Sequence, residues 1–121
     1  MTALVGQEAS LQVLDALARD ADQNAQDERL LARRIQKLRA GRAEGRSWQD
    51  LLSDEPHPGT LHLASEILAR LTRASGGLRR AVARGLRAEG ASIAAIAERF
   101  GVSRQRISTL LGRNGGANDS L

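Results

Sequence analysis

The spacing of apolar residues is the feature of this sequence that most restricts its fold. Leu and Ala recur three and four positions apart along most of the chain, and no stretch alternates apolar with polar side chains as a half-buried strand would. The abundant Leu, Ala, Arg and Glu residues also favour helix. The sequence therefore predicts an all-α fold, in which 121 residues provide one ordinary domain or two very small ones.

Composition excludes several classes of protein. The chain has no cysteine, which removes disulfides, thiolate zinc sites and cysteine nucleophiles. The first residues lack a secretion signal and the apolar runs are too short to span a membrane, so we expect a cytoplasmic protein. Only Trp48 and Phe100 are aromatic, a poor set for stacking single-stranded bases. No catalytic or nucleotide-binding motif stands out, and we expect neither enzymatic activity nor a cofactor.

Charge is distributed unevenly along the chain. The 18 basic residues are 17 Arg and one Lys, and the net charge is +4. Residues 1–60 carry 8 basic and 10 acidic groups, whereas residues 61–121 carry 10 basic and 4 acidic groups. We therefore expect an anionic partner to bind the C-terminal half.

The N-terminal part, residues 1–75, is predicted to be a helical region used for packing or dimerisation. Ser47 and Thr60 are the expected N-caps of two of its helices. Trp48 is expected to anchor the core of this region. The predicted helices cover residues 7–21, 26–43, 48–53 and 60–74. The polar segment 22–24 either interrupts or weakens the first helix, and the loop 54–59 and the pair Gly76–Gly77 are predicted breaks.

Three further helices, joined by two tight breaks, are predicted between residues 78 and 112. Gly90 ends the first helix and Ser92 caps the second. Gly101 makes the next turn and Ser103 caps the third helix, which Gly112 closes. The predicted helices span residues 78–89, 93–100 and 104–111, and the tail 114–121 is expected to be disordered.

This C-terminal region resembles the helix-turn-helix of bacterial DNA-binding proteins such as repressors, resolvases and sigma factors. The resemblance covers about 30 residues of the chain. It rests on the small residue, the turn glycine and the apolar positions of that pattern, which here are Ala97, Gly101, Val102, Ile107 and Leu110, with Ile93, Ile96 and Phe100 completing the apolar side. The resemblance implies a DNA-binding domain over residues 78–113 whose last helix reads duplex DNA.

The expected DNA contacts follow from which side of that last helix is apolar. Arg pairs with guanine, Gln with adenine, and Ser or Thr with base edges or phosphates. A preceding arginine stripe either clamps phosphate or is a solvated helix face. The expected contact residues are Ser103, Arg104, Gln105, Arg106, Ser108, Thr109 and Arg113, with Arg80, Arg84 and Arg87 forming the stripe.

A 45-residue internal repeat is a further prediction. Residues 42–47 and 87–92 agree at five of six positions. The first copy, over residues 31–71, would be a degenerate helix-turn-helix that has lost the glycine turn and serves packing or dimer contacts. Chance similarity in an arginine- and alanine-rich chain is the alternative. His57 and His62 beside loop carboxylates do not make a convincing metal site, and none is expected.

The expected function is therefore sequence-specific binding of double-stranded DNA by a bacterial or phage transcriptional regulator, located in the cytoplasm with the nucleoid. We expect a homodimer held by residues of about 4 to 35, where Leu11, Leu14 and Ala18 form an apolar seam. The alternative is an interaction module that docks on RNA polymerase or another regulator through its N-terminal helices. Sequence preference and steep salt dependence of DNA binding distinguish the two.

Overall fold

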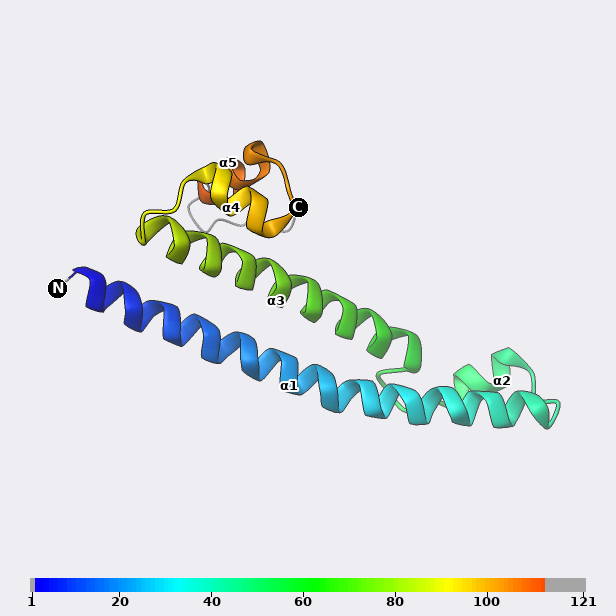
Figure 1. The fold of residues 1–121 in the computed structure, drawn as a ribbon. Coiled ribbons are helices and arrows are strands. Elements are labelled where there is room, and N and C mark those ends of the chain that lie inside the picture. The colour runs from blue at the N-terminus through cyan, green and yellow to red at the C-terminus, as the bar shows by residue number, and fades with distance from the viewer. Residues whose placement is uncertain (1, 113–121) are drawn as a thin grey trace. The chain divides into compact units, whose positions relative to one another are not determined.

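The computed structural model describes residues 2–112, with side-chain surroundings described from residue 10 onward. This part of the chain is entirely helical and contains no strand (Figure 1), which confirms the all-α fold class. None of its helices is long and apolar enough to cross a membrane. The helices are α1 (Thr2–Ala43), α2 (Trp48–Ser53), α3 (Thr60–Ala88), α4 (Ile93–Phe100) and α5 (Arg104–Gly112).

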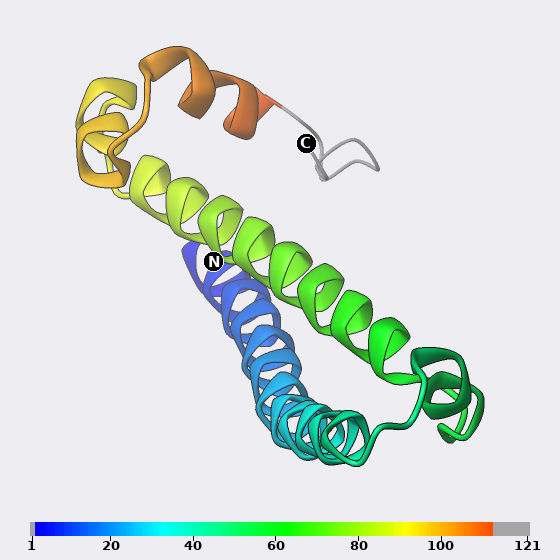
Figure 2. The same cartoon turned by 90° about the vertical axis from the view of Figure 1, so that its right-hand side faces the viewer.

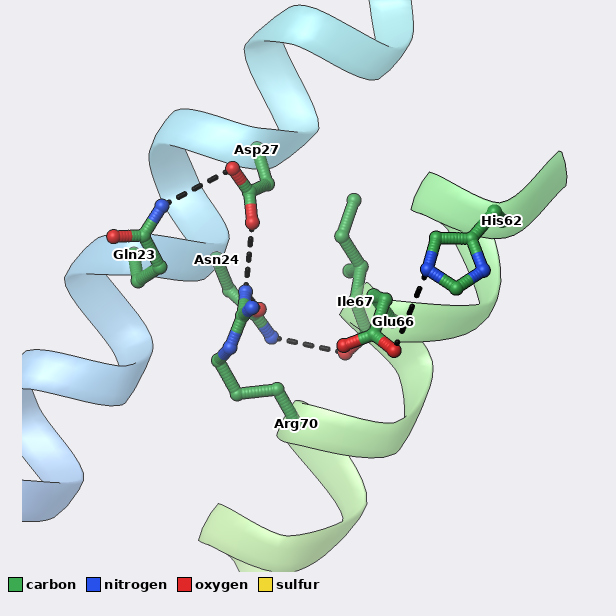
Figure 3. Close-up of polar contacts among 7 residues, drawn as sticks. All are labelled: Gln23, Asn24, Asp27, His62, Glu66, Ile67 and Arg70. Atoms are coloured by element: carbon green, nitrogen blue, oxygen red, sulfur yellow. Dashed lines mark hydrogen bonds and ion pairs between the residues drawn. The ribbon is translucent and has the colours of Figure 1, made fainter. Parts of the chain in front are cut away.

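Helix α1 is continuous, so the predicted break at residues 22–24 is wrong. Asn24, one of the polar residues expected to interrupt the helix, instead faces α3 (Figure 3). The side-chain amide of Asn24 donates to the Ile67 carbonyl at 3.0 Å and its oxygen accepts from Arg70 at 2.7 Å. Asn24 is buried, and these bonds give a partner to both its amide nitrogen and its oxygen. Asparagine has a low helix propensity, but its hydrogen bonds to another helix allow it to lie in the interior of α1.

Arg70 links two side chains of α1. Besides Asn24, its guanidinium binds the Asp27 carboxylate at 2.7 Å, and Gln23 donates to the other Asp27 oxygen at 3.1 Å (Figure 3). The Arg70 hydrogen bond lowers the pKa of Asp27, outweighing the effect of desolvation, which raises it. These contacts fix the register of α1 against α3 within the unit Asp20–Leu71.

Helix α3 also runs without interruption through Gly76 and Gly77, so the predicted stop at this pair is wrong. A Cβ atom on Gly77 would lie 3.2 Å from Cδ2 of Leu17. Glycine at this position therefore permits close approach of α1 to α3, and α3 tolerates its low helix propensity. Gly77, which was predicted to end the helix, instead provides the space into which Leu17 packs.

The chain divides into two compact units, Met1–Arg19 with Thr72–Leu121 and Asp20–Leu71. In the second unit, Leu51, Leu63 and Ile67 are buried. Trp48 is 55% exposed, so its predicted role as a core anchor is wrong. Its ring instead lies under the guanidinium of Arg42, 5.1 Å from the ring centroid, where the cation and the π-face attract each other.

The start of α3 differs from its predicted capping. Thr60 is the first residue of the helix, and the Gly59 carbonyl accepts the first helical hydrogen bond, from Leu63 at 2.9 Å. The Glu55 carboxylate accepts from both the backbone N–H of Thr60, at 3.2 Å, and its hydroxyl. A carboxylate is well placed at a helix N-terminus, where the free amides carry partial positive charge. Glu55 therefore supplies the cap expected from Thr60.

The two segments of the predicted repeat form matching turns. Gly45 and Gly90 have φ of +88° and +99°, in the left-handed region that favours glycine. Arg42 donates to the Arg46 carbonyl at 2.7 Å, and Arg87 to the Ala91 carbonyl at 3.0 Å. In the caps that follow, Ser47 and Ser92 each accept a backbone N–H three residues later at 3.1 Å, as predicted. The repeated sequence therefore has repeated local geometry.

Candidate nucleic-acid interface

The candidate interface is built on a small core of residues from the end of α3, α4 and α5. Figures 1 and 2 show α4 beside the end of α3. Ala83, Ile96, Ala97 and Ile107 are all buried, and Ile107 and Ala83 have no exposed surface. Small Ala83 and Ala97 let the helices approach closely. The partly buried residues around this core are Leu86, Ala91, Ile93, Phe100, Val102, Leu110 and Leu111.

Two glycine turns orient the helices. After Gly90, the N–H of Ala91 binds the Leu86 carbonyl at 3.0 Å. Gly101 has φ of +70° and its N–H binds the Glu98 carbonyl at 3.2 Å, while Val102 binds back to Ala97 at 3.0 Å. This left-handed ending satisfies carbonyls that the last turn of α4 would leave unpaired. Both predicted turns are confirmed.

Ser103 caps α5, as predicted from the sequence. Its hydroxyl oxygen accepts from the backbone N–H of Arg106 at 3.1 Å, and its carbonyl accepts from Ile107 at 3.2 Å. The cap leaves other N–H groups of the first turn of α5 without intrahelical partners. Such groups, with the partial positive charge of the helix end, favour a neighbouring anion.

All the expected contact residues on α5 and at its N-cap that the structure describes are exposed. The buried Ile107 holds one face of the helix against the core, and the polar residues occupy the rest. Arg113 lies outside the described residues. The exposed set is Ser103, Arg104, Gln105, Arg106, Ser108 and Thr109.

The expected arginine stripe on α3 is occupied in part by contacts within the chain. Arg87 is exposed, but its guanidinium donates to the turn at Ala91. Arg84 is exposed and Arg80 is half-buried, and both take part in interactions inside the protein. From the helical period, the three lie roughly 40° to 100° around α3 from buried Ala83, beside the core and not opposite it. These arginines have structural roles whether or not they also bind phosphate.

The segment that contains this interface is strongly basic. Residues 72–112 include eight arginines and two acidic residues, Glu89 and Glu98. A surface with this imbalance attracts a polyanion. The charge, the capped helix and its exposed polar row therefore occur in one compact unit.

Counting charge by halves of the chain missed a second basic segment. Residues 29–46 carry seven basic groups and one acidic group, whereas residues 8–28 carry one basic and six acidic groups. The acidic segment lies on α1, and the basic segment covers the end of α1 and the turn that follows it. A shorter counting window would have found this separation. Four of the basic side chains are exposed and make no ion pair within the described part of the chain, namely Arg29, Arg33, Lys37 and Arg39.

Among residues 2–112, no group of three or more His, Cys, Asp or Glu side chains is arranged to hold a metal ion. His62 lies 3.7 Å from Glu66 on the exposed side of α3 (Figure 3). Comparison of the chain with family models, with curated proteins and with solved structures found no match. The chemistry of the described side chains therefore carries the functional argument.

Proposed function

We propose that the end of α3, α4 and α5 form a helix-turn-helix and that the protein binds specific sequences of double-stranded DNA. The observation that carries the proposal is the exposed polar row on α5, opposite the fully buried Ile107. A helix anchored along one face and polar along the other fits the major groove, where base pairs present distinct hydrogen-bonding patterns. In this role the protein is a transcriptional regulator of a bacterium or phage, acting at the nucleoid.

The residues of α5 divide by the chemistry they offer. Gln105 suits the paired donor and acceptor of adenine, and Arg104 or Arg106 suits the two acceptors of guanine. Ser108 and Thr109 are short hydroxyl side chains that reach base edges or phosphates. The capped N-terminus of α5 and the arginines of residues 72–112 supply the phosphate contacts that hold the helix in register.

A selection from random duplexes, followed by salt titration of the selected site, tests this function. We expect one enriched motif and an observed binding constant that falls steeply as salt rises, since each phosphate contact releases counterions. His62→Ala, on the exposed start of α3, is a control that should leave binding unchanged. Binding without sequence preference and with a shallow salt slope contradicts the proposal.

A second function is favoured by the exposed apolar residues of α3. Leu61 and Leu68 are 71% and 64% exposed, more than a helix without a partner usually shows. This surface would suit a module that docks on another regulator or on RNA polymerase. A protein of this kind should bind duplex DNA without a selectable motif in the same experiment.

A further inference from the structure

Helix α1 carries three cations on one exposed side, each four positions after the one before it. They are Arg29, Arg33 and Lys37, which we call the basic row. All three side chains are exposed, and none makes an ion pair within the part of the chain that the structure describes. The row lies within the unit Asp20–Leu71, so one compact unit contains the whole surface.

The basic row points away from the packed side of α1. Residues nine positions apart in a helix lie about 180° apart around its axis. Arg33 is nine positions after Asn24, which donates to the Ile67 carbonyl of α3 at 3.0 Å. Arg29 is nine positions before the half-buried Leu38. The contacts that hold α1 in this unit therefore direct the row toward solvent.

The charges around the row differ from those of an ordinary solvated helix face, where opposite charges three or four positions apart support one another. The positions three and four residues before and after each member of the row contain no Asp or Glu. The members are instead each other's neighbours at this spacing, where like charges destabilise a helix. The row therefore weakens α1 by itself, and a bound anion would relieve the repulsion.

Other cations of the same segment have partners inside the unit. Arg34 donates to the Pro58 carbonyl, and the guanidinium of Arg46 pairs with the Asp54 carboxylate. These contacts connect the end of α1 to the loops around α2, so their side chains have structural roles. The basic row has no such contact, which leaves its charge available to a partner.

We propose that the basic row binds the phosphate backbone of double-stranded DNA, as a contact separate from α5. Its charges follow one another at about 6 Å along the helix, at roughly 1.5 Å per residue. A DNA duplex presents one negative charge per about 1.7 Å of its axis, so each of the three long side chains can meet its own phosphate. The choice of DNA as the polyanion rests on the proposed function, but this contact reads no sequence.

The residues around the row favour DNA over an anionic membrane surface. Helices that lie on membranes insert large apolar side chains next to their basic ones. The side chains between and beside the members of the row are short or polar, namely Gln26, Gln36 and Ala40. Ile35 is 51% exposed but lies roughly 160° around the helix from Arg33. The row therefore offers charge without an apolar surface to insert.

Two single substitutions with equal loss of charge test this contact. Arg33→Gln removes a member of the row, and Arg39→Gln removes an exposed cation without an ion pair, roughly 120° around the same helix. Glutamine has a helix propensity close to that of arginine. Fluorescence anisotropy with a scrambled duplex gives the slope of the logarithm of the binding constant against the logarithm of salt concentration. Arg33→Gln should make this slope shallower by about one unit, whereas Arg39→Gln should match the parent.

The triple variant Arg29→Gln/Arg33→Gln/Lys37→Gln should make the slope shallower by about two to three units, with unchanged helicity by circular dichroism. A triple variant with the slope of the parent overturns the proposal. Equal effects of Arg33→Gln and Arg39→Gln also overturn it, because net charge and not the row would then control binding. Binding to phosphatidylserine vesicles that depends on the row, with an unchanged slope for DNA, would assign the row to a membrane and overturn the proposal.

These outcomes are separable from those for α5. Gln105→Ala should lose preference for the selected site and keep the slope of the parent on the scrambled duplex. The triple variant should bind both duplexes more weakly and keep the preference. DNA binding that depends on the row but has no selectable motif would retain this inference and reject the proposed function. A selectable motif with no effect of the row would do the reverse.

Discussion

At the scale of single residues, the contacts around Arg70 explain why a polar segment lies inside a 42-residue helix. Asn24 and Asp27 are paired with Arg70 on the face of α1 that meets α3. A polar layer in an otherwise apolar interface favours one register of the two helices, because any slip leaves buried polar groups unpaired.

Asp27→Asn should make the protein less sensitive to acid. The pKa of Asp27 is lowered in the folded protein, chiefly by the Arg70 hydrogen bond. Its stabilising contribution is therefore present above the unfolded pKa of about 3.9 and is lost as pH falls through the lower folded value. The variant should be less stable than the parent by about 1–2 kcal/mol at pH 7, and the difference should disappear near pH 2.

Urea unfolding at both pH values measures this effect. Glu28→Gln, at an exposed residue of the same helix, is the matched control and should be about as stable as the parent at pH 7. An Asp27→Asn difference that persists at pH 2 would mean that the carboxylate charge is not the stabilising feature.

Gly101→Val should disrupt the turn between α4 and α5. Gly101 has φ of +70°, which a β-branched residue adopts at a cost of about 1–3 kcal/mol. Thermal unfolding should therefore occur at a lower temperature than in the parent. Gly112→Val, where a Cβ would meet open space and φ is not positive, is a comparison that should cost less. Equal melting of parent and Gly101→Val would contradict this account of the turn.

At the scale of elements, α5 has one face fixed by packing and another that is free to contact a ligand. Replacing Gln105 or Thr109 by Ala removes exposed polar atoms without disturbing buried Ile107. Each change should lower affinity for the selected DNA site by about 1–3 kcal/mol while helicity stays constant. Fluorescence anisotropy with the cognate and a scrambled duplex measures both affinity and specificity.

Replacement of Arg104 provides a contrast with these variants. If Arg104 binds phosphate, Arg104→Ala should lower the affinity for the cognate and the scrambled duplex by the same factor. The slope of the logarithm of the binding constant against the logarithm of salt concentration should then become shallower by about one unit. A loss of affinity for the cognate duplex alone would instead indicate that Arg104 contacts a base. Unchanged cognate binding by the Gln105 and Thr109 variants would reject the proposed orientation of α5.

At the scale of the whole molecule, the melting temperature should rise with the concentration of the selected DNA duplex. A ligand that binds only the folded chain stabilises it by mass action. Circular dichroism melts across a hundredfold range of duplex concentration should show this rise in the parent and in His62→Ala. Gln105→Ala should show a smaller rise at each concentration, because this variant should bind the selected site more weakly.

The sequence by itself determined the local structure of this protein. Helical periodicity predicted the fold class, and Gly90, Ser92, Gly101 and Ser103 predicted the end of α3, both ends of α4 and the start of α5. Such features depend on φ preferences and on hydrogen bonds between residues a few positions apart, which are visible in a short window. The exposed residues of α5 were also predictable, because the helical period places them away from the apolar position Ile107.

Tertiary contacts decided where the long helices continue and which apolar residues stay exposed. Asn24 is tolerated in α1 because Ile67 and Arg70, more than forty positions away, satisfy it, and Gly77 is tolerated in α3 because Leu17 packs on it. The local sequence shows only a polar residue or a glycine, both of which disfavour helix. The free energy that overrides this preference comes from partners distant in sequence, so only the folded chain reveals it.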